Sequence, residues 1–396
     1  MIGTDLLSGG LFAHDPFTAY QSGHITSPNV IVLGVIGSGK SSLLKTVYVL
    51  RPLLYAGRRV FVLDRKPRDD VGEYTELVER FKGNAIKMRT DEDGTRLNLL
   101  DPVIFRGAGP KAQMRLLKAV AEIGREDGTP LDSWEFKALR LARDAALREA
   151  ERQDRVPVLD YLVPALGAMT SEVRGRPEIA DLSKDSLERL HQAGVGLRFL
   201  FEEVVLEGLG GMFNGETSTN VRLSERLDSF DLSQLPSDGP AVPIAVAVAQ
   251  SWLMGMVTYE RGRQTNMVGE EGWHLLDGPG AKLVRSNQKL CRALGISNIY
   301  AMHHVADVDP RSVGMSIIKE AQTVHIYRQD RAADIDAVIQ MYDFDPATRH
   351  TLSSLPNGEH LCKIAERPEV RVRHMRSQLE SELTDTNEAM IRRGLA

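Results

Sequence analysis

The stretch "NVIVLGVIGSGKSSLLKTVYVL", residues 29–50, constrains the fold more than any other part of the chain. Its first residues, 29–33, form a short apolar run rich in β-branched side chains, which predicts a buried strand. An apolar helical pattern follows from Ser42 to Leu54. The segment between them, from Gly34 to Ser41, matches G-x-x-x-x-G-K-[ST]. Strand, loop and helix therefore occur in the order that a phosphate-binding loop requires.

The residue types of this loop fit a nucleoside triphosphate with its metal ion. Glycines let backbone N–H groups curl around phosphates, and the N-terminus of the following helix adds partial positive charge. Lys40 can reach the β- and γ-phosphates, and the Ser41 hydroxyl can ligate Mg²⁺. The sequence predicts that ATP and Mg²⁺ are held by Gly34, Gly37, Ser38, Gly39, Lys40, Ser41 and Ser42.

Composition limits the other classes of function. A chain of 396 residues with 42% hydrophobic content can bury a large core. The net charge of −5 disfavours a free nucleic-acid-binding module. The two cysteines, Cys291 and Cys362, indicate neither a disulfide framework nor a zinc site, and the N-terminus does not read as a signal peptide. We expect a cytoplasmic protein.

The segment 239–259 carries no charge and is about long enough to span a bilayer. It is also rich in alanine, has Gln250 near its middle, and contains Pro243 and Gly255. Two interpretations follow, a buried core helix and a membrane span. We favour the core helix.

Strands and helices alternate over the first hundred residues, as in "RRVFVLD" (58–64) followed by a helical pattern. Such alternation predicts an α/β fold with a mainly parallel sheet flanked by helices, here a RecA-like P-loop NTPase. The pattern is then purely helical, which indicates an inserted all-α subdomain. The expected organisation is a first ATPase part (1–108), the helical insertion (109–225), a second ATPase part (226–376) and a C-terminal tail (377–396).

A P-loop site needs a second acidic group for Mg²⁺, normally at the carboxyl end of an apolar strand. The segment "GWHLLDG" (272–278) reads as such a strand and ends in Asp277. Asp64, which ends the strand 58–64, is the alternative. We prefer Asp277 as the second metal ligand.

Several blocks together resemble a known family. They are "GVIGSGKSSLLK", "RRVFVLDRK", "TRLNLLDP", "GMFNGETS", "WHLLDG", "NQKLCRALGISNIYAMHHVADVD" and "PNGEHLCKI". In this order they resemble the TraC class of conjugation and type IV secretion ATPases within the HerA/FtsK superfamily, and most of all its actinobacterial members. The resemblance covers nearly all of the chain from Asp15 onward. It implies a hexameric motor that works with secretion-machine proteins at the inner face of the membrane, in the cytoplasm or peripherally attached.

The resemblance also implies roles for single residues. Arg292 stands where such ATPases carry an arginine that reaches the γ-phosphate of a neighbouring subunit, and Arg285 is the second candidate. His303 or His304 stands where many superfamily members place a phosphate-sensing glutamine. The alternatives are a solvated helix arginine and a core histidine.

One position departs from the family pattern. Members usually carry Asp-Glu at the acidic strand end, whereas this chain reads Asp277-Gly278. Glu270 and Glu271 precede the expected strand, so we place them at its wrong end. Without a water-positioning carboxylate, we expect weak turnover.

The sequence therefore predicts an ATPase with Lys40, Asp277, Arg292 and His303 as catalytic residues. The expected function is a motor of a conjugation or type IV secretion apparatus, with DNA as a candidate substrate. Two alternatives remain, an FtsK/HerA-like translocase of double-stranded DNA and a nucleotide-binding assembly protein with little turnover.

Overall fold

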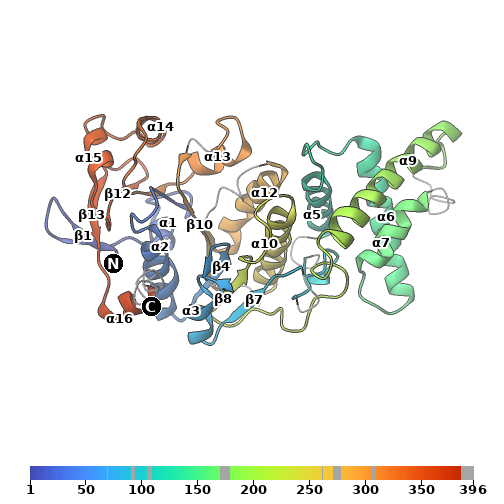
Figure 1. The fold of residues 1–396 in the computed structure, drawn as a ribbon, viewed down its shortest axis with the longest axis horizontal. Helices are drawn as coiled ribbons and strands as arrows, with labels where there is room; N and C mark the ends of the chain where they lie inside the picture. Colours follow the sequence, from blue (N-terminus) through green and yellow to red (C-terminus); the bar gives the residue numbers. More distant parts are fainter. Residues whose placement is uncertain are drawn as a thin grey trace, which may run out of the picture.

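The computed structural model describes residues 1–68, 70–90, 94–104, 109–169, 179–260, 262–270, 278–305 and 308–384. Among these residues, an 11-stranded sheet has the order β2-β1-β13-β12-β11-β3-β10-β9-β4-β8-β7 (Figure 1). Its strands are β1 (Gly3–Asp5), β2 (Leu11–Phe12), β3 (Val30–Leu33), β4 (Arg58–Asp64), β7 (Asn84–Lys87), β8 (Leu227–Asp231), β9 (Gln264–Gly269), β10 (Ile296–Met302), β11 (Thr323–Ile326), β12 (Glu359–Ile364) and β13 (Val370–His374). Two short strands, β5 (Pro67–Arg68) and β6 (Val71–Gly72), form a separate ribbon.

The strands from β11 to β7 in this order run parallel to one another. Leu33 at the end of β3 pairs with Met302 at the end of β10, and Gly269 at the end of β9 pairs with Leu63 on β4. The carboxyl ends of these strands therefore meet at one edge, where open α/β sheets bind ligands. The predicted mainly parallel sheet is confirmed.

The remaining strands extend this sheet in antiparallel fashion. The segment "GEHLCKIAERPEVRVRHM" (358–375) predicts a hairpin with a turn at Arg367-Pro368-Glu369. β12 and β13 form this hairpin, with Glu359 paired to Arg373. β1 then pairs antiparallel with β13, and β2 with β1. These two N-terminal strands were not expected, because each is too short to show a periodic pattern.

The helices cover the sheet or lie beyond it. Those before residue 100 are α1 (Pro16–Gln21), α2 (Lys40–Leu43), a π-helical stretch η1 (Leu44–Leu50), a 3₁₀ turn η2 (Arg51–Leu54) and α3 (Thr75–Arg80). The central ones are α5 (Pro110–Ile123), α6 (Ser133–Arg152), α7 (Leu159–Gly167), α9 (Lys184–Leu200), a second π-helical stretch η4 (Phe201–Glu207) and α10 (Ala241–Tyr259). The later ones are α12 (Gly278–Leu294), α13 (Val313–Lys319), α14 (Ala332–Tyr342), α15 (Thr348–Ser354) and α16 (Gln378–Thr384).

Helices α6, α7 and α9 form the end of the molecule that lies opposite α14 and α15 (Figure 1). α5 connects this helical end to the sheet layer, because it packs against both α10 and α12. The apolar residues of α6, such as Leu139 and Leu141, belong to the same core as Phe61 and Phe230 of the sheet. These helices therefore share one hydrophobic core with the sheet.

The uncharged segment forms α10, and its most apolar window, with a mean hydropathy of 1.6, is 83% buried inside the protein. Gln250 near its middle is also buried. By length and composition alone this helix could cross a membrane. The structure instead places it in the protein core, in agreement with the core-helix interpretation.

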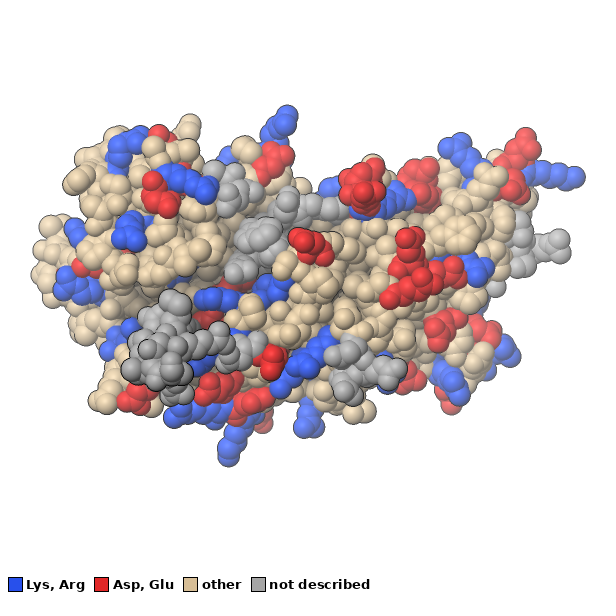
Figure 2. Space-filling model, viewed as in Figure 1, with Lys and Arg blue, Asp and Glu red and all other residues tan. Residues whose placement is uncertain are grey.

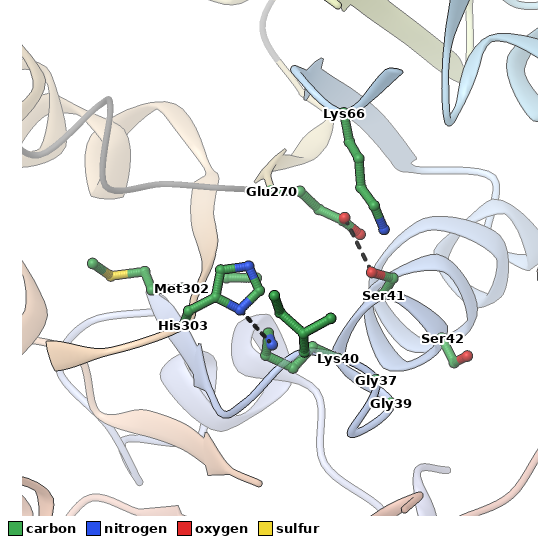
Figure 3. A pocket seen from close by; sticks show the side chains of 11 residues that line it. Gly37, Gly39, Lys40, Ser41, Ser42, Lys66, Glu270, Met302 and His303 are labelled. Atoms are coloured by element: carbon green, nitrogen blue, oxygen red, sulfur yellow. Dashed lines mark hydrogen bonds between the residues drawn. The ribbon is translucent and has the colours of Figure 1, made fainter. Parts of the chain in front are cut away.

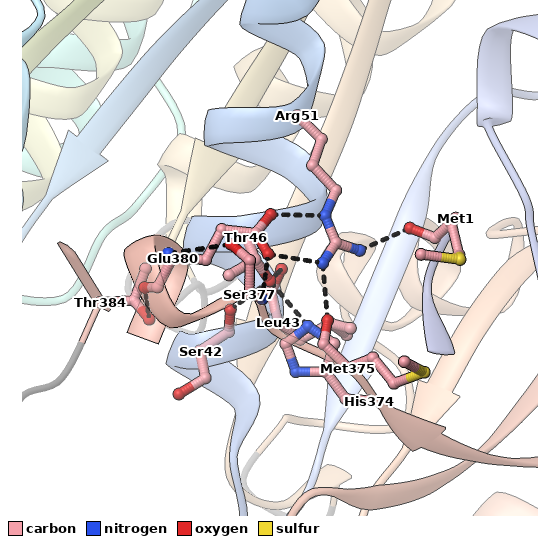
Figure 4. Close-up of polar contacts among 10 residues, drawn as sticks. All are labelled: Met1, Ser42, Leu43, Thr46, Arg51, His374, Met375, Ser377, Glu380 and Thr384. Atoms are coloured by element: carbon pink, nitrogen blue, oxygen red, sulfur yellow. Dashed lines mark hydrogen bonds and ion pairs between the residues drawn. The ribbon is translucent and has the colours of Figure 1, made fainter. Parts of the chain in front are cut away.

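The far end of the P-loop helix is tied to both ends of the described chain (Figure 4). Arg51 donates from Nη1 to the Met1 carbonyl at 2.5 Å, and its Nε lies 2.7 Å from Glu380 Oε1. One turn earlier, Thr46 Oγ1 lies 2.7 Å from His374 Nε2. The N-terminal strand, the C-terminal hairpin and α16 therefore hold the P-loop helix from behind.

The structure adds one strand that the sequence pattern did not reveal. This strand is β9, Gln264–Gly269. The expected strand 272–278 falls mostly on residues outside the described part of the chain, and Gly278 is the first residue of helix α12. Glu270 therefore follows a strand directly, and our placement of it at the wrong end of a strand was wrong.

Candidate nucleotide-binding site

The P-loop begins where β3 ends, and its backbone requires glycine. Gly34, Gly37 and Gly39 have φ angles of 153°, 75° and 113°, which L side chains rarely adopt. A Cβ atom added at Gly34 would lie 2.4 Å from Cβ of Tyr327. Tyr327 follows β11, the strand beside β3, so the neighbouring strand fixes the close approach that the loop needs.

The tip of the loop is also held by the C-terminal hairpin. The Ser38 hydroxyl donates to the Val35 carbonyl at 2.8 Å. The backbone N–H of Gly358, just before β12, donates to the Ser38 carbonyl at 2.9 Å. These bonds use carbonyl groups of the loop and hold its tip in a tight turn, of the kind whose N–H groups bind phosphate.

Lys40 lies inside the loop with its ammonium group anchored. Its Nζ donates to the carbonyls of Gly34 at 2.5 Å and Val35 at 2.9 Å, and it lies 3.1 Å from Nδ1 of His303. Burial lowers the pKa of Lys40 to about 8, while the nearby Glu270 carboxylate partly opposes this shift. The side chain is thus charged at neutral pH and is held at the edge of the cavity by the carbonyls of the loop.

The carboxylate of Glu270 joins the P-loop helix to the neighbouring strand (Figure 3). Its Oε2 accepts a hydrogen bond from the Ser41 hydroxyl at 3.1 Å, and its Oε1 accepts one from Tyr74 at 2.5 Å. Burial raises the pKa of Glu270, and the nearby Glu73 carboxylate adds to that shift. A cation beside this carboxylate would relieve the cost of its charge.

Mg²⁺ prefers oxygen ligands such as carboxylates and hydroxyls. Ser41 and Glu270 place one hydroxyl and one carboxylate within 3.1 Å of each other at the phosphate end of the cavity. This donor set fits Mg²⁺ with the usual division of roles between a P-loop hydroxyl and a strand-end acid.

His303 is the strand-end residue that touches the P-loop lysine. It follows β10, and burial together with the Lys40 charge lowers its pKa. The imidazole is therefore neutral at pH 7, so one ring nitrogen can donate a hydrogen bond while Nδ1 faces the ammonium. His304 points elsewhere, since its Nδ1 lies 2.9 Å from the buried Asp334 carboxylate. Of the two histidines, His303 is the one in the site.

The cavity enclosed by these groups has a volume of about 260 Å³. It is lined by Ile36, Gly37, Gly39, Lys40, Ser41, Ser42, Lys66, Glu270, Ala301, Met302 and His303. Of the loop residues predicted from the sequence, Gly34 and Ser38 support the loop from behind and the others face the cavity.

Three predicted residues lie elsewhere. Asp64 is fully buried and accepts a hydrogen bond from the Tyr74 N–H at 2.7 Å, and burial raises its pKa well above the ordinary value.

The two arginine candidates both lie on α12. Arg292 is near the end of this helix and donates to the Thr26 carbonyl at 3.2 Å. Arg285, earlier on the same helix, forms an ion pair of 3.5 Å with Glu320. Neither arginine contacts the cavity of its own subunit. Asp277 lies outside the described residues.

Searches by sequence gave no counterpart: no family model matches the chain, and no curated protein does. Solved structures do match. VirB4 of Thermoanaerobacter pseudethanolicus has a TM-score of 0.74 at 20% identity, over 96% of both chains. The bacterial conjugative coupling protein TrwB has a TM-score of 0.59 at 14% identity, over 92% of this chain and 86% of that one. The chain has the RecA-like fold of a P-loop NTPase. A TrwB structure with ADP and Mg²⁺ matches equally well, with a TM-score of 0.59 at 14% identity over the same shares of both chains.

Sequence reasoning missed Glu270, Lys66 and Tyr74. The signal for Glu270 was an acidic pair directly after the alternating segment "QTNMVG". That segment was overlooked because the more apolar "WHLL" lies nearby. No local pattern marks Tyr74, which reaches the site only because β4 and β9 are neighbours in the sheet.

Proposed function

We propose that this chain binds Mg·ATP and hydrolyses it as a motor of a conjugation or type IV secretion apparatus. One observation carries the proposal: Lys40, Ser41, Glu270 and His303 meet in one cavity at the carboxyl edge of the sheet. The motif order and the fold shared with VirB4 and TrwB support the cellular role.

The roles of the residues follow from their positions. Lys40 would leave its carbonyl partners for the β- and γ-phosphates, and the loop N–H groups would bind the same oxygens. Ser41 and Glu270 would hold Mg²⁺, which neutralises the negative charge on the phosphate oxygens. His303 would donate from its ring to the terminal phosphate and thereby respond to its presence.

Glu270 also changes the expectation for the rate. The argument for weak turnover assumed that Gly278 follows the strand-end acid, but Gly278 opens helix α12. After β9 the chain reads Glu270-Glu271, two consecutive carboxylates as in the Asp-Glu pair of the family. We infer that a residue for activating water is present. We therefore propose that ATP is hydrolysed at an ordinary rate, instead of the weak turnover expected from the sequence.

The assembly and location are also proposals. A site whose arginine comes from a neighbour is complete only in a ring, so we propose a hexamer with Arg292 acting in trans. The partners would be secretion-machine proteins at the inner face of the membrane. The inserted helices 109–225 would form a helical subdomain packed on the ATPase core.

Phosphate release with and without double-stranded DNA tests the proposal against the translocase alternative. Figure 2 shows Lys, Arg, Asp and Glu side chains interspersed on the visible face, with no continuous basic stripe among its described residues. We therefore expect turnover that double-stranded DNA stimulates little. Strong stimulation would favour a DNA translocase, and ATP-dependent oligomerisation without phosphate release would favour an assembly protein.

A further inference from the structure

Lys66 brings a second ammonium group to the cavity, on the side opposite the P-loop lysine. It follows β4, and its side chain extends toward Glu270 and Ser41 (Figure 3). Lys66 lines the same cavity as Lys40 and is 41% exposed. The sequence analysis gave it no role, because its position depends on the neighbouring strands β4 and β9.

Lys66 is the second of two lysines that pair with the carboxylate of Glu73. Its Nζ lies 2.8 Å from Oε2 of Glu73. Oε1 of Glu73 is 2.6 Å from Nζ of Lys45, and both of these side chains are only 2% exposed. The buried Lys45 therefore neutralises Glu73 without Lys66. Lys66 is thus not the only cation on Glu73, and its ammonium also acts on the Glu270 carboxylate, where it partly opposes the rise in pKa that burial causes.

The charge of Lys66 also acts on the cationic side of the cavity. Lys66 contributes to lowering the pKa of both Lys40 and His303 across the cavity. An anion placed between the two lysines would therefore be attracted by both. Glu73 would keep its buried pair with Lys45 through Oε1, while its Oε2 would give up the Lys66 ammonium to the anion.

Building on the proposed function, we propose that Lys66 leaves Glu73 to bind the γ-phosphate of ATP and is a further positioning residue of the reaction. Lys40 approaches the phosphates from the P-loop, and Lys66 approaches the terminal phosphate from the β4 side, next to the Ser41–Glu270 pair. ADP has no γ-phosphate, so with ADP Lys66 stays on Glu73. Lys66 thus distinguishes ATP from ADP.

The affinities of Lys66→Gln for the slowly hydrolysed analogue ATPγS and for ADP, both with Mg²⁺, test this inference by calorimetry. A hydrogen bond to a charged group corresponds to about a tenfold to hundredfold change in affinity. We expect a loss of that size for ATPγS, ADP affinity within about twofold of the wild type by the same scale, and partial rescue by Lys66→Arg. Lys87→Gln, a change at a lysine on β7 with a similar 40% exposure, is the matched control.

Two results would overturn the inference. Equal losses for ATPγS and ADP would show that Lys66 only supports the loop, and unchanged affinity for both would show no contact. A wild type that binds neither nucleotide would instead refute the proposed function. Thermal melting of each variant checks folding, and Lys66→Met gives a second neutral side chain if the glutamine variant unfolds.

Discussion

The hydroxyl of Ser41 lies 3.1 Å from a carboxylate oxygen of Glu270, although the two residues are separated by most of the ATPase core in sequence. Ser41 begins the P-loop helix, and Glu270 follows β9, which is separated from the P-loop strand by β10 alone. This one contact identifies which strand end faces the loop. It supports Glu270 as the acidic half of the site, whereas Asp277 lies outside the described residues.

Lys40→Ala should lose about a hundredfold in ATP affinity, because the variant lacks the ammonium that would make charge-assisted hydrogen bonds to the phosphates. Calorimetry with Mg·ATPγS measures the loss. Lys87→Ala is the control. Unchanged affinity in Lys40→Ala would remove the P-loop assignment.

ATP affinity should fall as the pH rises above about 8, because burial lowers the pKa of Lys40 to about 8 in the free protein. The charged form of Lys40 binds the phosphates, so ATP affinity has its full value below that pH. Above it the affinity drops about tenfold per pH unit, until the pH reaches the pKa of Lys40 in the nucleotide-bound protein. Titrations between pH 7 and 9.5 should also show proton uptake on binding above pH 8. A flat profile over this range would contradict the shifted lysine.

Stability should decrease in mild acid because of a buried group of histidines behind the P-loop. Burial lowers the pKa of His360 and His374 to about 3, and that of His325 well below its ordinary value. Each stays neutral in the folded state and gains a proton on unfolding. Below pH 6.5, the free energy of unfolding should fall by about 1.4 kcal/mol per pH unit for each of them.

Urea unfolding at pH 7.5 and 5.5 measures this effect, and His360→Met separates one contribution. Neither ring nitrogen of His360 has a hydrogen-bond partner in the structure. The variant should therefore be at least as stable at pH 7.5. In acid its free energy of unfolding should fall less steeply than that of the wild type, by about 1.4 kcal/mol per pH unit. An unchanged acid slope would show that His360 is protonated in the folded protein.

Mixing Lys40→Ala with Arg292→Ala subunits should restore part of the ATPase activity. Arg292 precedes β10 whereas the cavity lies after it, so the arginine is about 20 Å from the cavity of its own subunit at 3.3 Å per residue. Only a neighbour's site could receive it. Absence of recovery at every mixing ratio, with recovery in the same experiment for Arg285→Ala, would assign the role to Arg285.

The fold was largely predictable because its strands and helices carry strong local patterns. The strand before the P-loop, the hairpin at the end and the uncharged helix were all predicted from apolar runs or turn residues. β9 was not, because its first residues are polar. Asn266 is buried there and donates to the Tyr48 carbonyl at 2.8 Å. A strand whose polar groups are satisfied by a distant helix has no recognisable pattern in its own sequence.

The candidate site was predictable from local pattern only on its P-loop side. Lys40 and Ser41 belong to a contiguous motif, whereas Glu270, Lys66 and Tyr74 come together through the order of the strands. His303 was expected from the resemblance, and the structure places it 3.1 Å from Lys40. The position of a strand-end residue follows from the sheet topology, which a local pattern does not contain.

Steady-state phosphate release by the wild type, Glu270→Gln and Asp277→Asn tests the central claim most directly. Calorimetry on the same samples confirms that each variant is folded and binds nucleotide. We predict that the wild type hydrolyses ATP, that Glu270→Gln lowers the rate by a factor on the order of 10²–10⁴, and that Asp277→Asn keeps most of it. The opposite pattern, a near-normal rate in Glu270→Gln and an inactive Asp277→Asn, would contradict the assignment of Glu270.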